Sequence, residues 1–274
     1  FIHYSNRDND FYLLRNTTDL WITKKVSFRQ PNRLAELWDP LTGEIIPIPV
    51  AEADQVYSRI VLSLAPYASY FIAFTGRTST PAGFVASEER RILYTMDGHY
   101  FPDENERQVV LDGSWTLKFP PDRGAPDSVS LPSLISWSEA EHAGVRYFSG
   151  IATYSRQFQF DMRFERGSDR VFLEMADVAE VAEVWLNDKL LGITWTKPHR
   201  FDITDIVRSG ANELNIEVAN TWSNRLTGDA VTGSRFTETN IRKANKYATE
   251  WKDVPLRKSG LTGPVTITIS TLVQ

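Results

Sequence analysis

A short segment that follows the last long predicted strand carries the densest mixture of chemical groups in the chain. It supplies an indole, an amide, a guanidinium and a carboxylate, from Trp222, Asn224, Arg225 and Asp229. An indole packs against the apolar face of a pyranose, and the planar polar groups bind its hydroxyls. These residue types favour contact with a sugar. Two further indoles lie in predicted loops that could converge with the segment: Trp195 and Trp251.

The same segment fits two arrangements without a ligand. Arg225 and Asp229 have opposite charges, so they could pair with each other while Trp222 caps the fold. The surface could also dock on another domain. Sugar contact, internal bracing and docking therefore stay open at this point.

Paired acids are the second chemistry to consider, because glycoside hydrolysis uses two carboxylates about 5–10 Å apart across the scissile bond. The best local pair is Glu139 and Glu141, in a predicted loop beside Trp137 and His142. Residues two apart in a loop have no fixed separation. We therefore expect solvated charge here and no catalytic residue in the chain.

Metal chemistry has weak sequence support. Asn6, Asp8 and Asp10 have the alternating oxygen spacing of a calcium loop, but Phe11 and Thr17 stand where that loop needs Gly and Glu. Zinc needs clustered ligands. The chain has no cysteine, and its histidines are far apart: His3, His99, His142 and His199. We expect no zinc site, while a structural calcium held by loop carbonyls stays open.

Charge and composition exclude other classes. The net charge is −5, and the acidic and basic residues are interspersed, so no basic stripe is available for nucleic acid. No phosphate-binding loop or nucleophile elbow is present. No apolar run is long enough for a membrane span, and no leader sequence opens the chain. Because the chain starts with Phe, we expect a trimmed or excised piece.

Short alternating segments at regular spacing predict an all-β first domain. In Ser58–Leu64, for example, Ile60, Leu62 and Leu64 alternate with Arg59, Val61 and Ser63. The predicted strands are Phe11–Arg15, Leu20–Phe28, Leu34–Asp39, Glu44–Pro49, Ser58–Leu64 and Tyr67–Thr75. Residues 76–107 lose the alternation and collect Gly, Pro and charge, so we place an inter-domain linker there.

The second domain shows the clearest alternation. In Arg170–Ala176 and Asn212–Asn220 every second residue is apolar, which predicts strands with one buried face. Asn187 and Asp188 tolerate positive φ, so they predict a tight hairpin turn. Thr204 or Asp205 could cap a single helical turn before the Ser209–Gly210 turn.

Further strands are predicted at the domain's start and end, at Trp115–Phe119, Tyr147–Gly150, Thr153–Phe160 and 265–270. One helix is predicted between Thr239 and Trp251, because apolar residues recur there at three- and four-residue spacing.

Several motifs carry a resemblance to known families. Ala182–Asn187, Leu191–Gly192, Phe201–Thr204 and Gly210–Leu214 resemble the jelly-roll sugar-binding domain of family 2 glycoside hydrolases. Other segments are similar to the C-terminal region of family 106 enzymes, which are α-L-rhamnosidases. They are Phe1–Tyr4, Asp10–Leu13, Trp38–Gly43, Trp195–Pro198, Asn220–Asp229 and Pro255–Val265.

The resemblance implies an all-β chain of two β-sandwich domains, with residues 1–100 following a catalytic barrel and residues 101–274 forming a galactose-binding-like jelly roll. It implies that the whole enzyme is bacterial, periplasmic or secreted, and removes terminal α-L-rhamnose with inversion. A calcium ion would lie near the barrel site and the catalytic acids on the barrel. It also places His3 near the substrate pocket, although in an isolated fragment a frayed terminus is expected.

The resulting expectation is a non-catalytic part of a glycoside hydrolase with no required cofactor, which braces the barrel and contacts carbohydrate. The alternatives are a stand-alone lectin-like module, or a small complete glycosidase that uses Glu139 and Glu141.

Overall fold

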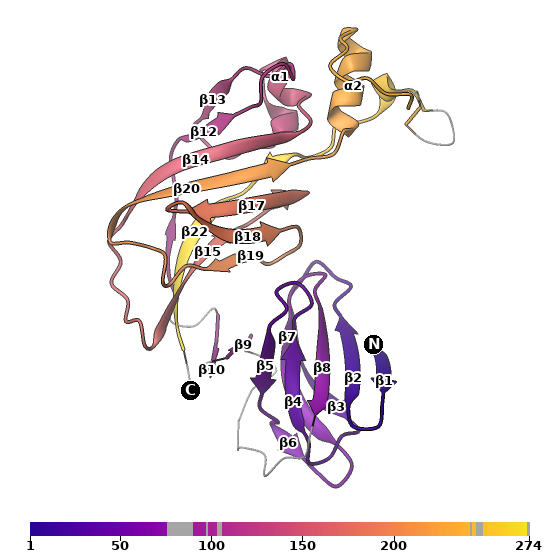
Figure 1. Cartoon of the computed structure of the whole chain (residues 1–274), viewed down its shortest axis with the longest axis vertical. Coiled ribbons are helices and arrows are strands. Elements are labelled where there is room, and N and C mark those ends of the chain that lie inside the picture. The colour runs from indigo at the N-terminus through magenta and orange to yellow at the C-terminus, as the bar shows by residue number, and fades with distance from the viewer. Residues whose placement is uncertain (76–89, 97, 103–105, 242, 245–248, 273–274) are drawn as a thin grey trace. The chain divides into compact units, whose positions relative to one another are not determined.

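The computed structural model describes residues 1–75, 90–96, 98–102, 106–241, 243–244 and 249–272. The chain is nearly all β and divides into two compact units (Figure 1). The first unit contains the described residues of 1–107, 165–170 and 269–272, and the second contains residues 108–164 and the described residues of 171–268. The domain boundary near residue 100 stays a prediction.

Two antiparallel sheets form most of the first unit. One has the strand order β1-β2-β8-β4-β5, with bounds Ile2–Ser5, Asp10–Arg15, Ser69–Thr75, Leu34–Trp38 and Ile45–Ile48. The other has the order β3-β7-β6, with bounds Ile22–Phe28, Ser58–Leu64 and Glu52–Ala53.

The core of the first unit is built from the alternating apolar residues of these strands. Tyr12, Phe28 and Phe74 pack ring against ring, with centroids 5.0–5.9 Å apart, and Ile60 and Ile72 are fully buried beside them. Aromatic and β-branched side chains bury the most area per ordered residue, which stabilises a small sandwich. The expected linker also contains a two-stranded sheet, β9 (Leu93–Thr95) and β10 (Gly98–Tyr100).

The second unit is a sandwich built from a six-stranded sheet and most of a four-stranded sheet. The six-stranded sheet has the order β13-β12-β14-β20-β17-β18, with bounds Ser128–Leu131, Trp115–Lys118, Ile151–Phe160, Gly210–Ala219, Val181–Leu186 and Lys189–Thr194. The four-stranded sheet has the order β11-β22-β15-β19, with bounds Arg107–Val110, Val265–Thr271, Asp169–Met175 and His199–Asp202. A short pair joins β16 (Val178–Ala179) to β21 (Gly260–Leu261).

A buried hydrogen-bonded core organises one end of this sandwich. Trp137 Nε1 donates to the Tyr154 hydroxyl at 2.6 Å, and the Leu261 amide donates to the same oxygen at 3.0 Å. Gly260 lies against this pair with φ +84°, and a Cβ there would collide with both aromatic side chains. Only glycine satisfies this close approach and the left-handed backbone together.

The predicted hairpin is present between β17 and β18. Asn187 and Asp188 have φ of 51° and 64°, the values that a tight two-residue turn requires. The cap of the following turn differs from the expectation. The capping side chain belongs to Asp202 and not to Thr204 or Asp205. Asp202 Oδ1 accepts from the Thr204 amide at 2.9 Å.

Helices depart most from the sequence expectation. Residues 147–150, which were expected to be a strand, follow the short helix α1 (Ala143–Arg146), and α2 (Ser223–Thr232) begins directly after the β20 strand. The helix expected between Thr239 and Trp251 falls partly outside the described residues; the described ones include a bridge between Lys243 and Glu250. Two single-turn 3-10 helices complete the described elements, η1 (Trp137–Glu139) and η2 (Trp251–Asp253).

Candidate functional site

An open groove of about 600 Å³ lies on the outer face of the six-stranded sheet. Trp222 forms one part of it with 59% of its surface exposed, and Ile151 is 54% exposed. The other lining residues are Lys118, Phe119, Pro120, Arg123, Ser149, Gly150, Thr153, Glu217 and Asn220.

The sheet register sets three of the polar groups in one row. Lys118 on β12 pairs with Thr153 on β14, which pairs with Glu217 on β20. Alternate residues of β14, such as Ala152 and Tyr154, are buried, so the row faces outward. Neighbouring strands lie about 4.8 Å apart, which puts the Cα atoms of Lys118 and Glu217 roughly 10 Å from each other.

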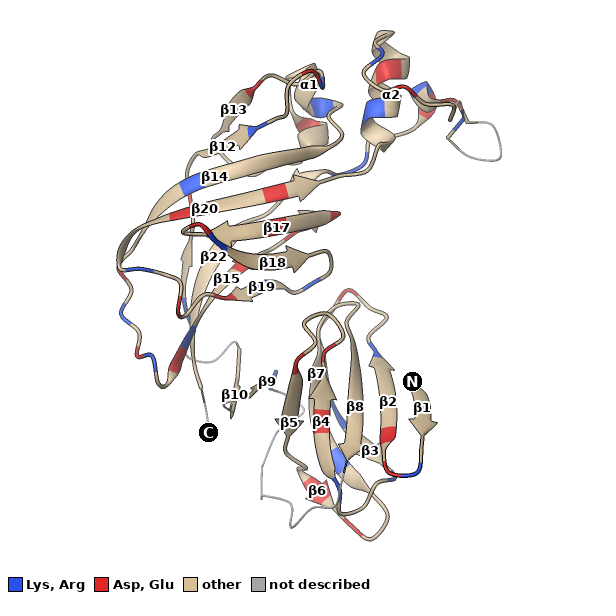
Figure 2. Ribbon diagram, viewed as in Figure 1, with Lys and Arg blue, Asp and Glu red and all other residues tan. Residues whose placement is uncertain are grey.

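The groove therefore has walls of different charge. Lys118 and Arg123 lie on the β12 side and Glu217 on the β20 side; in Figure 2 β12 carries basic colour and β20 acidic colour. Within the part of the chain that the structure describes, none of these three side chains, nor Thr153, has a hydrogen-bond or ion-pair partner. Exposed charges without partners are free to bind a ligand.

Other lining residues are committed to the fold. Asn220 Oδ1 accepts from the Gly150 amide at 2.9 Å, and its Nδ2 donates to the Phe148 carbonyl at 2.9 Å. Ser149 Oγ accepts from the Arg225 amide at 3.0 Å. These contacts fix the start of β14 and the start of α2 around the groove.

Asn224 is buried and binds the chain that returns from the long β20–β21 connection. Its Nδ2 donates to the Arg257 carbonyl at 2.7 Å and to Ser259 Oγ at 2.8 Å, and its Oδ1 accepts from the Arg257 amide at 2.7 Å. All three bonds go to residues more than 30 positions away in sequence. The side chain thus clamps the base of that connection.

Arg225 and Asp229 form a buried ion pair within α2. Arg225 Nε lies 2.9 Å from Asp229 Oδ1, although the two atoms are not aligned for a hydrogen bond. The guanidinium lies over the Phe236 ring at 4.8 Å. Asp229 Oδ2 accepts from the Phe236 and Thr237 amides at 3.1 and 3.0 Å. This arrangement matches internal bracing, and sugar contact by these residues stays a prediction.

The other two predicted indoles lie away from the groove lining. Trp251 begins η2, and its Nε1 donates to the Ile241 carbonyl at 3.1 Å. Trp195 follows β18 and is 62% exposed. Among the residues that line the groove, Trp222 is the one that the sequence pointed to.

A second polar cluster surrounds Asp177 at the loop end of the same unit. Asp177 Oδ2 accepts from Lys258 Nζ at 2.6 Å and Thr262 Oγ1 at 2.8 Å, and Oδ1 lies 3.7 Å from Lys197 Nζ. Burial raises the pKa of Asp177, but these hydrogen bonds and cations outweigh it, so the pKa is lowered. The charged carboxylate of Asp177 thus links three loops.

His199 is buried beside this cluster and is neutral at pH 7. Its Nδ1 lies 2.8 Å from Thr194 Oγ1. Burial lowers its pKa to about 4; Asp177 opposes that shift and Lys197 adds to it. Protonation of a buried imidazole is unfavourable, so His199 should lower the stability of the folded chain at acid pH.

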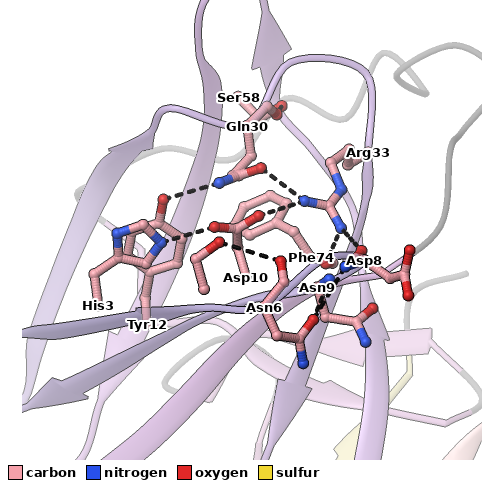
Figure 3. Close-up of polar contacts among 11 residues, drawn as sticks. His3, Asn6, Asp8, Asn9, Asp10, Tyr12, Gln30, Arg33, Ser58 and Phe74 are labelled. Carbon is pink, nitrogen blue, oxygen red and sulfur yellow. Dashed lines mark hydrogen bonds and ion pairs between the residues drawn. The ribbon is translucent and has the colours of Figure 1, made fainter.

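In the first unit His3 joins a polar network with Asp10 and Arg33 (Figure 3). Asp10 accepts from His3 Nε2 at 2.9 Å and Arg33 Nη1 at 2.6 Å, and the His3 ring stacks on Tyr12 at 4.2 Å. Burial raises the pKa of Asp10, but hydrogen bonds from His3, Ser5 and Arg33 outweigh it, and the pKa is lowered. The network ties edge strand β1 to the sheet.

Glu139 and Glu141 were the candidates for catalysis, and clustered His, Asp and Glu side chains would be the candidates for metal binding. Glu139 and Glu141 are exposed and lie outside the groove lining. The described residues contain no group of three or more His, Asp or Glu side chains that could hold a metal. A calcium ion near the barrel site, or one held by loop carbonyls, stays a prediction. No described helix is long and apolar enough to cross a membrane.

The groove residues that sequence reasoning missed are Lys118, Arg123, Thr153 and Glu217. They are outward members of alternating strands and a loop, a pattern shared by many solvated residues. They become recognisable once the pairing order of the strands is known, because that order puts these positions side by side.

Comparisons with known proteins agree with this fold. Residues 139–262 match the family model for the glycosyl hydrolase 2 galactose-binding domain-like domain. Seven of the eleven residues that line the groove lie within this range: Ser149, Gly150, Ile151, Thr153, Glu217, Asn220 and Trp222. The chain thus contains a galactose-binding-like domain of the kind associated with glycoside hydrolases.

Two relatives extend the similarity. The chain is 34% identical over 180 residues to a Formosa agariphila protein named "Putative beta-glucuronidase", an alignment covering 59% of this chain and 16% of that protein. It is also similar to the rhamnosidase from Novosphingobium sp. PP1Y, with 33% identity and a TM-score of 0.81. That match covers 97% of this chain and 23% of the rhamnosidase. The chain therefore spans less than a quarter of either protein.

Proposed function

We propose that this chain is a non-catalytic β-sandwich portion of a glycoside hydrolase of the α-L-rhamnosidase kind, and that it braces a catalytic barrel and contacts glycan. One observation carries the proposal: almost the whole chain, 97%, aligns with 23% of a solved rhamnosidase at a TM-score of 0.81. This match includes residues of both units, whereas the family model matches only residues 139–262.

The assignment of catalysis to another part of the enzyme rests on the groove's chemistry. The groove lining contains one carboxylate, Glu217, whereas glycoside hydrolysis uses two across the scissile bond. The buried Arg225–Asp229 pair and the Asn224 clamp hold the β20–β21 connection in place. Buried contacts of this kind are suited to bracing a neighbouring domain.

A chimera tests the bracing role. The aligned region of the Novosphingobium rhamnosidase is replaced by this chain, and hydrolysis of an aryl α-L-rhamnoside is compared with that of a variant in which the region is deleted. We expect the chimera to keep activity that the deletion loses, and this chain alone to release no nitrophenol. A chimera no better than the deletion contradicts bracing, and release by the chain alone contradicts the non-catalytic assignment.

The open groove favours a second candidate, a stand-alone glycan-binding module, because its polar groups are free and its indole is exposed. Calorimetric titration with rhamnose and rhamnosides at millimolar concentration separates the two. Strong binding together with an inactive chimera would favour the module.

A further inference from the structure

We infer that the groove beside Trp222 binds a saccharide that carries an anionic group, a carboxylate or a sulfate, with Lys118 and Arg123 holding the anion. This inference deepens the glycan contact of the proposed function and rests on it. It depends on the distribution of charge, exposure and partners within the groove.

The first step is the sign of the net charge of the residues that line the groove. Its lining contains two cations, Lys118 and Arg123, and one carboxylate, Glu217, in a chain whose net charge is −5. A local positive excess on a negative protein attracts anions to that place and away from the rest of the surface.

The second step is the availability of those charges. Among the described residues most buried charges are paired, as in Arg225–Asp229, but Lys118 and Arg123 have no partner there. Charge-assisted hydrogen bonds to a carboxylate or sulfate are about twice as strong as neutral ones. An anion in the groove would give both cations their first partner.

The third step is the rest of the ligand. The Trp222 indole and the Ile151 side chain offer exposed apolar surface, which suits the C–H face of a sugar ring. Thr153 and Glu217 lie across the row from Lys118 and can bind hydroxyls. The two walls therefore orient a ligand with an anion on one edge and hydroxyls on the other.

A second hollow lies further along β14. This smaller hollow of about 270 Å³ is lined by Ser114, Thr116, Ser155, Arg156, Gln157 and Glu213. Thr153, Ser155 and Gln157 are successive outward residues of β14, so the two hollows follow one strand at about 7 Å per outward residue. This length suits an oligosaccharide better than a single sugar.

Calorimetry on the full chain with a matched ligand pair tests the inference. The ligands are trigalacturonate and its methyl ester, which keeps the shape and removes the charge; glucose 6-sulfate and glucose form the sulfate arm. We expect millimolar binding of the charged member and at least tenfold weaker binding of its neutral partner. Binding should weaken as salt rises. Equal binding of both members in the two arms overturns the inference, as does the absence of binding by both anions.

Variants locate the site. Lys118→Ala with Arg123→Ala should weaken trigalacturonate about tenfold, and Trp222→Ala should weaken both members of a pair. Lys189→Ala is the matched control, because Lys189 is an exposed β18 lysine outside the groove. Glu217→Gln should strengthen anion binding a few-fold by removing a like charge, a sign that a structural role would not give.

Each variant is first checked for a native circular dichroism spectrum and thermal midpoint. An unchanged affinity in the double variant, or an equal loss in Lys189→Ala, overturns the inference. Inorganic sulfate that competes as well as the saccharide would show a simple ion site and would also overturn it. The chimera assay does not depend on binding of an anionic saccharide. A negative binding result would therefore leave the bracing proposal to be tested by the chimera.

Discussion

The groove and the α2 brace adjoin each other in the second unit and use their polar side chains in opposite ways. In the brace Asn224, Arg225 and Asp229 are buried or nearly so, and each has partners within the protein. In the groove Lys118 and Arg123 are exposed and have no partner among the described residues. The same residue type, arginine, is structural at one position and free at the other.

The difference teaches that chemical type alone does not identify a contact residue. Trp222 and Arg225 are three positions apart, yet one is 59% exposed and the other 4%. Trp222 is the residue before α2, whereas the residues Asn224 through Gly228 within the helix are all buried. Variants in the brace should therefore change the free energy of unfolding, whereas variants in the groove should change ligand affinity.

The largest expected effect comes from breaking the brace. Arg225→Ala leaves the Asp229 carboxylate without its cation, so we expect the free energy of unfolding to fall by about 3–5 kcal/mol in chemical denaturation. Arg123→Ala is the matched control and should change it by less than about 0.5 kcal/mol. Arg225→Met with Asp229→Asn should recover part of the loss. Equal effects of the two arginine substitutions would remove the distinction between brace and groove.

Acid should weaken the second unit through His199. The unfolded chain takes up a proton near pH 6.5, whereas the folded chain resists protonation until about pH 4. The free energy of unfolding should therefore fall by about 3 kcal/mol between these values. His199→Gln should flatten this part of the pH profile in denaturation measurements. A profile identical to that of the parent chain would show that His199 is not the titrating group.

Asn224→Ala should cost about 2–3 kcal/mol of unfolding free energy, because the Arg257 amide and carbonyl lose their side-chain partner. Asn240→Ala is a suitable comparison, since Asn240 is exposed. Both variants are measured by urea denaturation. A loss below about 0.5 kcal/mol for Asn224→Ala would mean that water replaces the clamp.

The smallest effect on stability is expected in the groove. Trp222→Ala should change the free energy of unfolding by less than about 0.5 kcal/mol, because the indole is largely exposed. Trp137→Ala, in which a 1% exposed indole is removed, should cost about 3–5 kcal/mol. Thermal denaturation distinguishes them, and a large loss for Trp222→Ala would place that indole in the brace.

The local sequence pattern predicted most strands, because the alternation of apolar and polar residues along a strand can be read from the sequence. The Asn187–Asp188 turn was predictable for the same reason, since few residue pairs accept positive φ. Helix α2 was not, because Thr227, Gly228 and Thr232 are poor helix formers and its apolar face is weak. Tertiary packing of the helix overrides that preference.

The groove could be predicted only in part. Trp222 is recognisable as an aromatic at a strand end, but Lys118, Thr153 and Glu217 come from three strands far apart in sequence. Their proximity depends on the order in which strands pair, which alternation does not specify. The burial of Arg225 likewise depends on Phe236 and Tyr147, which approach from separate loops.

The close approach at Gly260 sets a limit on sequence variation. Every side chain larger than hydrogen would displace either Trp137 or Tyr154 and would also strain the backbone. In a library that offers all twenty amino acids at position 260, soluble clones should retain glycine almost alone, while exposed Gly43, with open space around it, should accept Asn and Asp. A residue without a side chain thus sets a tight constraint on divergence in this unit.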